Sequence, residues 1–281
     1  MKRGLGAYGY TLLEVMIVLA ISGGLLVSTM FLISGQQQRT QFSQAIKEIE
    51  SQIQDVINDV ATGYYANTGD FACDATTEGP RLTGSATDTQ GENKDCVFLG
   101  RVMHFGVRDS ENEQYNILNV IGLREHFSNG QYQQSQTLGD ARPVAMAPGS
   151  QDDPASFPDT TDSRQLRFGL RILSMRVNGQ PIGAVGFLGS LAPYGSTAGN
   201  LVSGAQTVEL VAIPGTNLDM SPTDMVDAIN SIGTVAVTKN PASGVVLCFQ
   251  SGGTNEYGKI TIGSNGRQLT TSLVITTESC A

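Results

Sequence analysis

Residues 10–33 read YTLLEVMIVLAISGGLLVSTMFLI, and this apolar stretch decides how the rest of the chain is interpreted. Glu14 is its one side chain that is charged at neutral pH. At about 1.5 Å per residue an α-helix of this length covers roughly 36 Å, which is enough to cross a bilayer. Lys2 and Arg3 precede the stretch, so the positive-inside rule predicts a cytoplasmic N-terminus and places the rest of the chain outside.

The helical pattern continues beyond this stretch, but its character changes. Apolar residues recur at spacings of three and four between Phe42 and Val60, while charged and amide side chains occupy the other face. No proline interrupts residues 10–62, and Gly63 is a suitable C-terminal stop. The sequence therefore predicts one helix over 10–62, which is transmembrane over 10–33 and amphipathic afterwards. We expect the second half to pack on the chain's own β-sheet, and a coiled-coil seam is the alternative.

Residues 63–281 have the pattern of one β-rich globular domain with long loops. Short apolar or alternating runs predict strands at 97–107, 117–123, 165–172, 182–188, 208–213, 235–237, 245–249, 259–262 and 269–276. Turns are predicted at Asn178-Gly179 and Ser264-Asn265-Gly266, a short helix from Ser221-Pro222 to Ile229, and loops at 64–96, 128–165 and 189–206. One long helix followed by mostly antiparallel strands and a late helix predicts an α+β fold.

The composition indicates which classes of partner and which redox compartment to expect. The formal net charge is -9, and an acidic surface argues against broad binding to the phosphate backbone of nucleic acids. The four cysteines, Cys73, Cys96, Cys248 and Cys280, fall in two sequence-local pairs without a CxxC motif. An even number fits two disulfides formed in an oxidising compartment, although four cysteines allow three pairings. Four reduced thiols are the alternative.

Two partial motifs for enzyme or zinc chemistry are interpreted as structural. Residues 253–259 nearly complete a phosphate-binding loop, but Ile260 stands where Ser or Thr is required. The segment also opens a strand, whereas a phosphate cradle opens a helix. The two histidines, His104 and His126, have no helical or cysteine partner in the spacing of a zinc site.

An acidic loop is the remaining candidate for metal binding. Asp152, Asp153, Asp159 and Asp162 crowd a proline-rich segment, which is interpreted as a solvated loop. Calcium binding is the alternative, although the spacing of an EF-hand is missing. We therefore expect a protein that is not an enzyme and has no cofactor and no metal site.

The segment before the apolar stretch is short, basic and glycine-rich, and reads MKRGLGAYG over residues 1–9. A secretory signal has a shorter apolar core followed by a small-x-small cleavage site, and no such site follows here. The better cleavage point lies before the apolar run, between Gly9 and Tyr10. The run of glycine, aromatic residue, threonine, two leucines and glutamate resembles the class III signal (prepilin-type N-terminal methylation motif) of type IV pilins and pseudopilins. The matching residues are Gly9, Tyr10, Thr11, Leu12, Leu13 and Glu14.

The resemblance implies a role for each part of this motif. A prepilin peptidase would cut after Gly9, removing residues 1–9 as a leader, and would methylate the new terminus at Tyr10. Glu14 would be the assembly glutamate. A carboxylate that enters the bilayer costs about 2.5–3.5 kcal/mol on insertion scales, so it is normally paired. The amine created at Tyr10, on the same chain or a neighbour, is a suitable partner.

The resemblance also implies a location, partners and disulfides. The chain would span the cell membrane once before assembly, with its domain outside, and would then join an extracellular pilus. Its partners would be other pilin subunits, the prepilin peptidase and the inner-membrane assembly platform. Pilins commonly tie down a C-terminal loop, which points to a Cys248–Cys280 bridge. A Cys73–Cys96 bridge would close the loop-like segment between those residues.

The specific motif covers residues 1–34, and the remainder resembles the family in architecture only. The chain is longer than a typical major pilin, so we expect a minor pilin, or a major pilin with large insertions. The family implies adhesion, twitching motility or DNA uptake. A pseudopilin of a type II secretion or competence system is the alternative in the same class. A membrane-anchored enzyme or receptor domain is the alternative in another class, and it predicts neither cleavage at Gly9 nor a filament.

Overall fold

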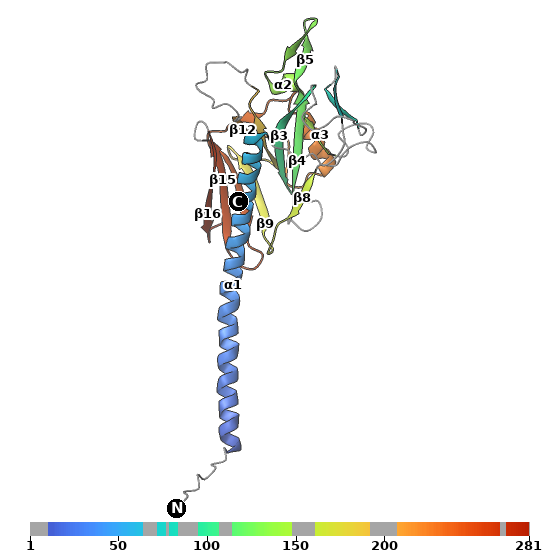
Figure 1. Cartoon of the computed structure of the whole chain (residues 1–281). Helices are drawn as coiled ribbons and strands as arrows, with labels where there is room; N and C mark the ends of the chain where they lie inside the picture. The colour runs from blue at the N-terminus through green and yellow to red at the C-terminus, as the bar shows by residue number, and fades with distance from the viewer. Residues whose placement is uncertain are drawn as a thin grey trace, which may run out of the picture.

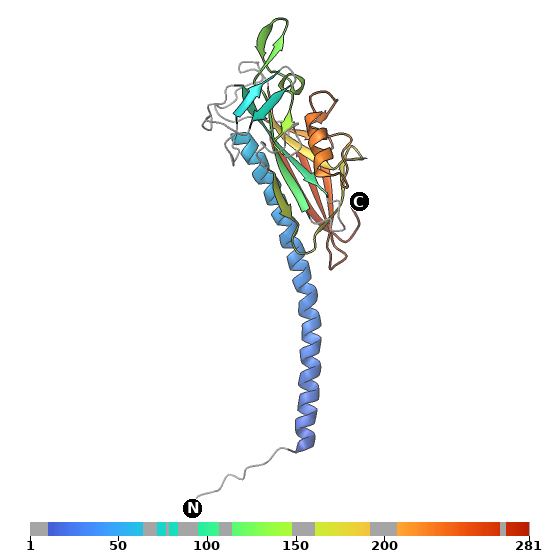
Figure 2. The same cartoon turned by 90° about the vertical axis from the view of Figure 1, so that its right-hand side faces the viewer.

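The chain forms a long N-terminal helix and a domain of antiparallel strands (Figure 1). The computed structural model describes residues 11–63, 72–76, 79–83, 95–106, 114–147, 161–191, 207–264 and 268–280. Helix α1 (Leu12–Thr62) emerges from one end of the domain and extends well beyond it (Figures 1 and 2). An apolar N-terminal helix joined to antiparallel sheets confirms the α+β class.

Helix α1 begins and ends with recognisable capping signals. Thr11 is the N-cap, with its side chain accepting a hydrogen bond from the Glu14 backbone N–H. Gly63 ends the helix in the left-handed conformation at φ 69°, and its N–H donates to the carbonyl oxygens of Asp59 and Val60. The 51 residues correspond to about 77 Å of helix. The unbroken helix and its stop at Gly63 are confirmed.

Two antiparallel sheets make up most of the domain. The larger sheet has the order β13-β12-β11-β3-β4-β7, with β8 also paired to β4. Its strands are β3 (Cys96–Phe105), β4 (Gln114–Leu123), β7 (Val144–Ala145), β8 (Asp162–Gln165), β11 (Ala184–Gly189), β12 (Val208–Ala212) and β13 (Thr238–Lys239). The smaller sheet, β10-β9-β14-β15-β16, has β9 (Arg171–Val177), β10 (Gln180–Pro181), β14 (Val245–Gln250), β15 (Tyr257–Ser264) and β16 (Leu269–Thr276). Two hairpins stand apart: β1 (Ala72–Ala75) with β2 (Pro80–Thr83), and β5 (Glu125–Ser128) with β6 (Gln131–Gln134).

The second half of α1 contributes to the main hydrophobic core. Its buried residues are the ones that set the helical periodicity of the sequence: Phe42, Ala45, Ile46, Ile49, Ile53, Val56, Ile57 and Val60. They share one cluster with residues of both sheets, including Phe187 of β11 and Phe249 of β14. Gly258 of β15 leaves room for the helix, because a Cβ there would lie 2.8 Å from Ile46 Cγ1. Each fully buried aliphatic side chain contributes about 1.5–3 kcal/mol, so this cluster is a major source of the domain's stability.

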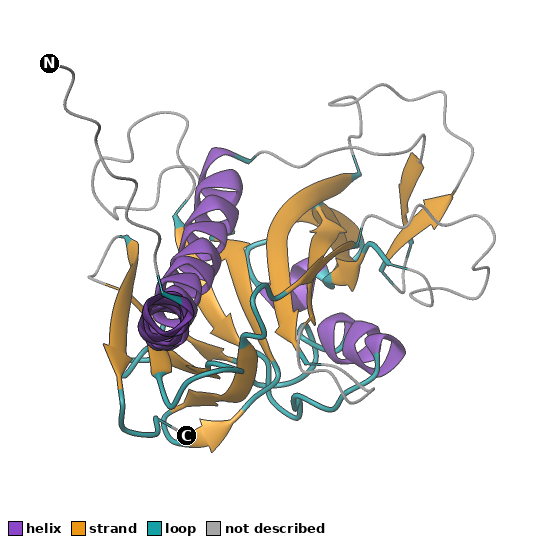
Figure 3. Ribbon diagram, turned by 90° about the horizontal axis from the view of Figure 1, so that it is seen from below, coloured by secondary structure: helices purple, strands orange, loops and turns teal. Residues whose placement is uncertain are grey.

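Helix α3 (Pro222–Asn230) belongs to a second cluster. Ser221 caps it by accepting a hydrogen bond from the Asp224 N–H, and Pro222 occupies the first helical position, as predicted. Its buried residues Met225, Val226 and Ile229 pack with residues of the larger sheet and with the short helix α2 (Leu138–Ala141). Seen from below, α1 and α3 lie on different sides of the strands (Figure 3). The larger sheet is therefore covered on both faces.

Strand β16 is an edge strand that is held in several ways. It pairs with β15 along its whole length, from Ser264↔Leu269 to Tyr257↔Thr276. Thr271 Oγ1 accepts a hydrogen bond from Gln54 Nε2 of α1 at 2.7 Å and lies 3.1 Å from Glu50 Oε1, to which it donates.

The two disulfides each connect a strand to a residue 23 or 32 positions further along the chain. Cys73 of β1 is bonded to Cys96 of β3, and Cys248 of β14 is bonded to Cys280, which follows β16. Both pairings are the sequence-local ones that we expected.

The predicted strand at 165–172 is wrong. Strand β8 ends at Gln165 and β9 begins only at Arg171. Between them Phe168 and Gly169 adopt left-handed conformations, at φ 57° and 66°, and reverse the chain. Leu166 and Leu170 are buried on either side of this turn. The alternation of apolar residues over 165–172 therefore comes from buried residues that flank a turn and not from a strand.

Other element boundaries also need correction. The predicted loop at 64–96 contains β1 and β2, and the predicted loop at 128–165 contains β6, α2, β7 and β8. Each of these strands has four residues or fewer, which is too short to show the apolar alternation that marks a strand. The predicted strand at 235–237 is wrong, because β13 is formed by Thr238–Lys239. The Asn178-Gly179 turn is confirmed, with both residues at positive φ between β9 and β10. Residues 265–267 of the other predicted turn lie outside the described residues.

Candidate functional site

The exposed half of α1 is the most unusual surface of the described chain. Leu12–Met30 has a mean hydropathy of 2.1, and none of it is buried. Its large apolar side chains are between 47% (Val15) and 77% (Leu12) exposed. An apolar surface of this extent is the mark of an interface with lipid or with protein. Among the described helices it is the one long and apolar enough to cross a membrane.

The polar side chains within this segment are satisfied by the helix itself. Ser22 Oγ donates to the Val18 carbonyl oxygen at 2.7 Å, and Ser28 Oγ donates to that of Gly24 at 2.9 Å. Thr29 Oγ1 donates to the Leu26 carbonyl oxygen at 2.9 Å. A hydrocarbon environment offers no other partner, so internal satisfaction is what it requires. The hydroxyl groups are therefore compatible with insertion into a bilayer.

Thr11 and Glu14 form a reciprocal capping box at the start of this segment. Glu14 Oε2 accepts hydrogen bonds from the Thr11 backbone N at 3.0 Å and from Thr11 Oγ1 at 3.1 Å. Glu14 N donates to Thr11 Oγ1 at 3.3 Å. The carboxylate thus lies in the first turn of the helix, where the helix dipole favours a negative charge. Gly9 and Tyr10, the predicted cleavage and methylation positions, lie outside the described residues.

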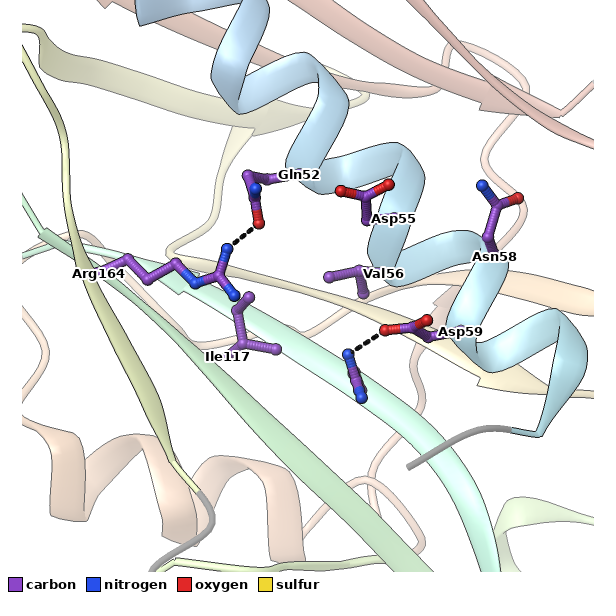
Figure 4. Close-up of a pocket in the computed structure, with 8 residues that line it drawn as sticks. Gln52, Asp55, Val56, Asn58, Asp59, Ile117 and Arg164 are labelled. Carbon is purple, nitrogen blue, oxygen red and sulfur yellow. Dashed lines mark hydrogen bonds and ion pairs between the residues drawn. The ribbon is translucent and has the colours of Figure 1, made fainter. Parts of the chain in front are cut away.

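A polar groove marks the other end of α1, beside β3, β4 and β8 (Figure 4). It is lined by Gln52, Asp55, Val56, Asn58, Asp59, Arg101, Ile117 and Arg164. Arg101 Nη1 lies 2.6 Å from Asp59 Oδ2, and Arg101 Nε donates to Asn119 Oδ1 at 3.1 Å. Arg164 reaches across the groove to Gln52 (Figure 4) and also pairs with Asp162 at 2.7 Å. Both cations are therefore engaged, and the groove connects the helix to the larger sheet.

The groove was not predicted from the sequence. Its arginines and their helix partners are far apart along the chain, and nothing in their local sequence marks them. Arg101 stands within an apolar strand candidate, and Asp59 stands on the polar side of an amphipathic helix. These contexts are typical of solvated side chains.

The two histidines lie in different settings. His104 of β3 is 1% exposed, and neither ring nitrogen has a hydrogen-bond partner of normal geometry in the described part of the chain. Burial lowers the pKa of its imidazole to about 4, an effect that the backbone of Asn217 opposes only in part. His126 of β5 lies beside Asp140, with Nε2 3.7 Å from Oδ1. His104 is therefore neutral at physiological pH, as a structural residue would be.

The other partial motifs lie only in part within the described residues. Of the acidic loop, Asp162 pairs with Arg164, whereas Asp152, Asp153 and Asp159 lie outside the described residues. No group of three or more His, Cys, Asp or Glu side chains that could hold a metal occurs among the residues that were placed. Gly258 and Lys259 of the partial phosphate-binding loop lie in β15, and no helix follows them there.

Comparison with protein-family models, with curated proteins and with solved structures finds no match to this chain. Its function is therefore inferred from its own residues. The features that bear on it are the exposed apolar half of α1, the Thr11–Glu14 capping box and the burial of the second half of the same helix.

Proposed function

We propose that this chain is a structural subunit of a type IV pilus, a minor pilin that is assembled through α1. The observation that carries the proposal is the division of a single unbroken helix between two environments. From Phe42 onward its apolar residues lie in the core of the domain, whereas Leu12–Met30 exposes every apolar side chain. A helix that served only its own domain would have no use for the exposed half.

The apolar side chains of Leu12–Met30 must be shielded from water both before and after assembly. Before assembly, lipid covers it, and the satisfied hydroxyl groups of Ser22, Ser28 and Thr29 fit that environment. In the filament, the same segments of neighbouring subunits cover it and form a bundle of helices. Assembly then exchanges lipid for protein contacts, and no active site is required.

Glu14 gives this exchange its direction and register. Cleavage after Gly9 creates an ammonium group at Tyr10, one helical turn from Glu14. In the proposed filament that amine pairs with the Glu14 carboxylate of an adjacent subunit, because a charged pair in an apolar bundle is far less costly than a lone charge. The leader at 1–9 prevents this pairing until the prepilin peptidase removes it, and the inner-membrane assembly platform then receives the subunit.

The test is the mass of the native N-terminus together with the location of the protein. A pilin begins at methylated Tyr10 and is recovered with filaments that are sheared from cells. A membrane-anchored enzyme or receptor domain keeps its leader and stays in the membrane fraction. A chain that begins at Met1 and is never found in filaments would overturn the proposal. Recovery from a short periplasmic pseudopilus would assign it instead to a secretion or competence system.

A further inference from the structure

The turn between β8 and β9 presents an aromatic side chain to solvent. Phe168 is 51% exposed and has a left-handed backbone at φ 57°, a conformation that is unfavourable for a bulky residue. Its neighbours Leu166 and Leu170 are buried and fix the two ends of the turn. The fold therefore holds Phe168 outward in a strained turn, although a polar residue or glycine would suit a turn in water better.

This turn lies at the end of the domain from which α1 emerges. A Cβ on Gly169 would lie 3.6 Å from Gly252 Cα, and a Cβ on Gly253 would lie 3.2 Å from Gln38 Cδ of α1. Gln38 is exposed and lies four residues before Phe42, a buried residue of α1. Both side views show α1 leaving the domain at one end and the β5–β6 hairpin at the other (Figures 1 and 2).

Two arginines flank the turn, and each is more exposed than its acidic partner. Arg39 Nε lies 3.5 Å from Glu256 Oε1, with side chains 72% and 16% exposed. Arg167 Nη1 lies 3.5 Å from Glu48 Oε1, with side chains 68% and 41% exposed. The outermost groups of this surface are therefore guanidiniums beside an aromatic ring. We call the surface formed by Arg39, Arg167, Phe168 and the loop 252–256 the helix-exit face.

The helix-exit face is at the height of a lipid headgroup layer when α1 spans a bilayer. Gln38 follows the end of the apolar run at Ile33 by five residues, or about 7–8 Å of helix. Each headgroup layer adds about 5–8 Å to the hydrocarbon core, and a tilt of about 20° is usual for a membrane helix. A tilt toward the domain therefore brings Phe168 within reach of the bilayer surface.

We infer that the helix-exit face binds the outer surface of the membrane, with Phe168 in the interfacial region and Arg39 and Arg167 at lipid phosphates. Guanidinium groups match phosphate oxygens in geometry, and aromatic rings favour the boundary between acyl chains and headgroups. This contact would set how the domain stands on the membrane before assembly. The inference rests on the proposed insertion of α1, so its test must separate the two.

The absence of tryptophan from the chain supplies the experiment. Phe168→Trp places the single tryptophan of the full-length protein on the helix-exit face, and the protein is reconstituted in phosphatidylcholine vesicles. Phe127→Trp is the matched control, because Phe127 is 57% exposed in the β5–β6 hairpin at the opposite end. Leu19→Trp reports on the helix itself. Quenching is measured with spin-labelled headgroups for Phe168→Trp and Phe127→Trp, and with brominated acyl chains for Leu19→Trp.

We expect Phe168→Trp to be quenched at least about twofold more strongly than Phe127→Trp, as befits a residue at the interface. Strong quenching of Leu19→Trp with equal quenching of the two domain reporters would overturn the inference and leave membrane insertion intact. No quenching of Leu19→Trp would overturn both. A Phe168→Trp signal that changes only in assembled filaments would assign the helix-exit face to a second subunit. If Phe168→Trp fails to fold, Asn255→Trp in the adjacent loop measures headgroup quenching at the same face.

Discussion

Arg101 of β3 donates a hydrogen bond to Asp59 of α1 across 2.6 Å, although 42 residues separate the two in the sequence. The arginine side chain is 13% exposed and that of the aspartate 34% exposed, so the pair is shielded only in part. It joins the last turns of the helix to the centre of the larger sheet, on the rim of the polar groove.

Loss of the carboxylate at this pair should destabilise the domain. Asp59→Ala leaves Arg101 with its hydrogen bond to Asn119 but without its carboxylate partner, and should lower the free energy of unfolding by about 1–3 kcal/mol, after allowance for solvent screening. Asp55→Ala, an exposed neighbour in the same groove, should change it by less than about 0.5 kcal/mol. Urea unfolding of both variants in mild detergent measures the difference. Equal stability of the two would show that the pair is a passive surface contact.

The contact between α1 and β15 leaves no space for an added methyl group at Gly258. A Cβ there would lie 2.8 Å from Ile46 Cγ1 and 3.4 Å from Phe42 Cζ. Gly258→Ala should therefore lower the free energy of unfolding by about 1–3 kcal/mol through overpacking. Gly263→Ala is the control on the same strand, because nothing lies within 4 Å of a Cβ at that position. A Gly258→Ala protein as stable as Gly263→Ala would contradict the close packing of helix and sheet.

His104 should make the stability depend on pH in a defined window. Burial lowers the pKa of its imidazole to about 4, so the unfolded chain binds the proton more readily than the folded one. Stability should therefore fall as the pH drops from about 6.5 toward 4, by an amount on the order of 3 kcal/mol, and this effect should level off below 4. His104→Leu should flatten the slope in that window, whereas His126→Gln should retain it. Denaturant unfolding at several pH values distinguishes the variants, and an unchanged slope in His104→Leu would assign it to other groups.

Glu14→Ala should separate insertion from assembly. Removal of the carboxylate takes away an insertion penalty of about 2.5–3.5 kcal/mol, so the variant should enter the membrane at least as well as the natural chain. Its incorporation into filaments should fall, because the Tyr10 amine of the neighbouring subunit loses its partner. Alkali-resistant membrane association and the amount in sheared filaments measure the two steps. Thr11→Val, which keeps the carboxylate, is the companion variant, and normal incorporation of Glu14→Ala would remove the role proposed for this residue.

The helix could be predicted from the sequence because its signals are local. A 3.6-residue periodicity identified the buried face of α1, and Gly63 identified its end. The apolar strands β3, β4, β14 and β16 were recognised for the same reason. Strands β5 and β6 were missed because they are short and mostly polar, and β1 was missed because four residues are too few to show a pattern. The turn at Phe168 was missed because alternation over three apolar residues fits a strand as well as it fits two anchors around a turn.

The candidate site was predictable only in the apolar half of α1. Apolar length and the absence of proline are both properties of one continuous segment. The pairing of Arg101 with Asp59 depends on how β3 is placed against α1, and this placement is decided by the packing of the core. No pattern in either local sequence carries that information.

The attachment of β16 has a mechanical consequence. Thr271 links this strand to Gln54 and Glu50 of α1, and the Cys248–Cys280 bond fastens the chain just beyond it to β14 in the middle of the smaller sheet. Tension along the helix axis would pass in part through these contacts into β16, an edge strand that is paired on one side only. The Cys248–Cys280 bond transmits force on β16 to β14 in the middle of the smaller sheet. The domain therefore resists the detachment of its edge strand.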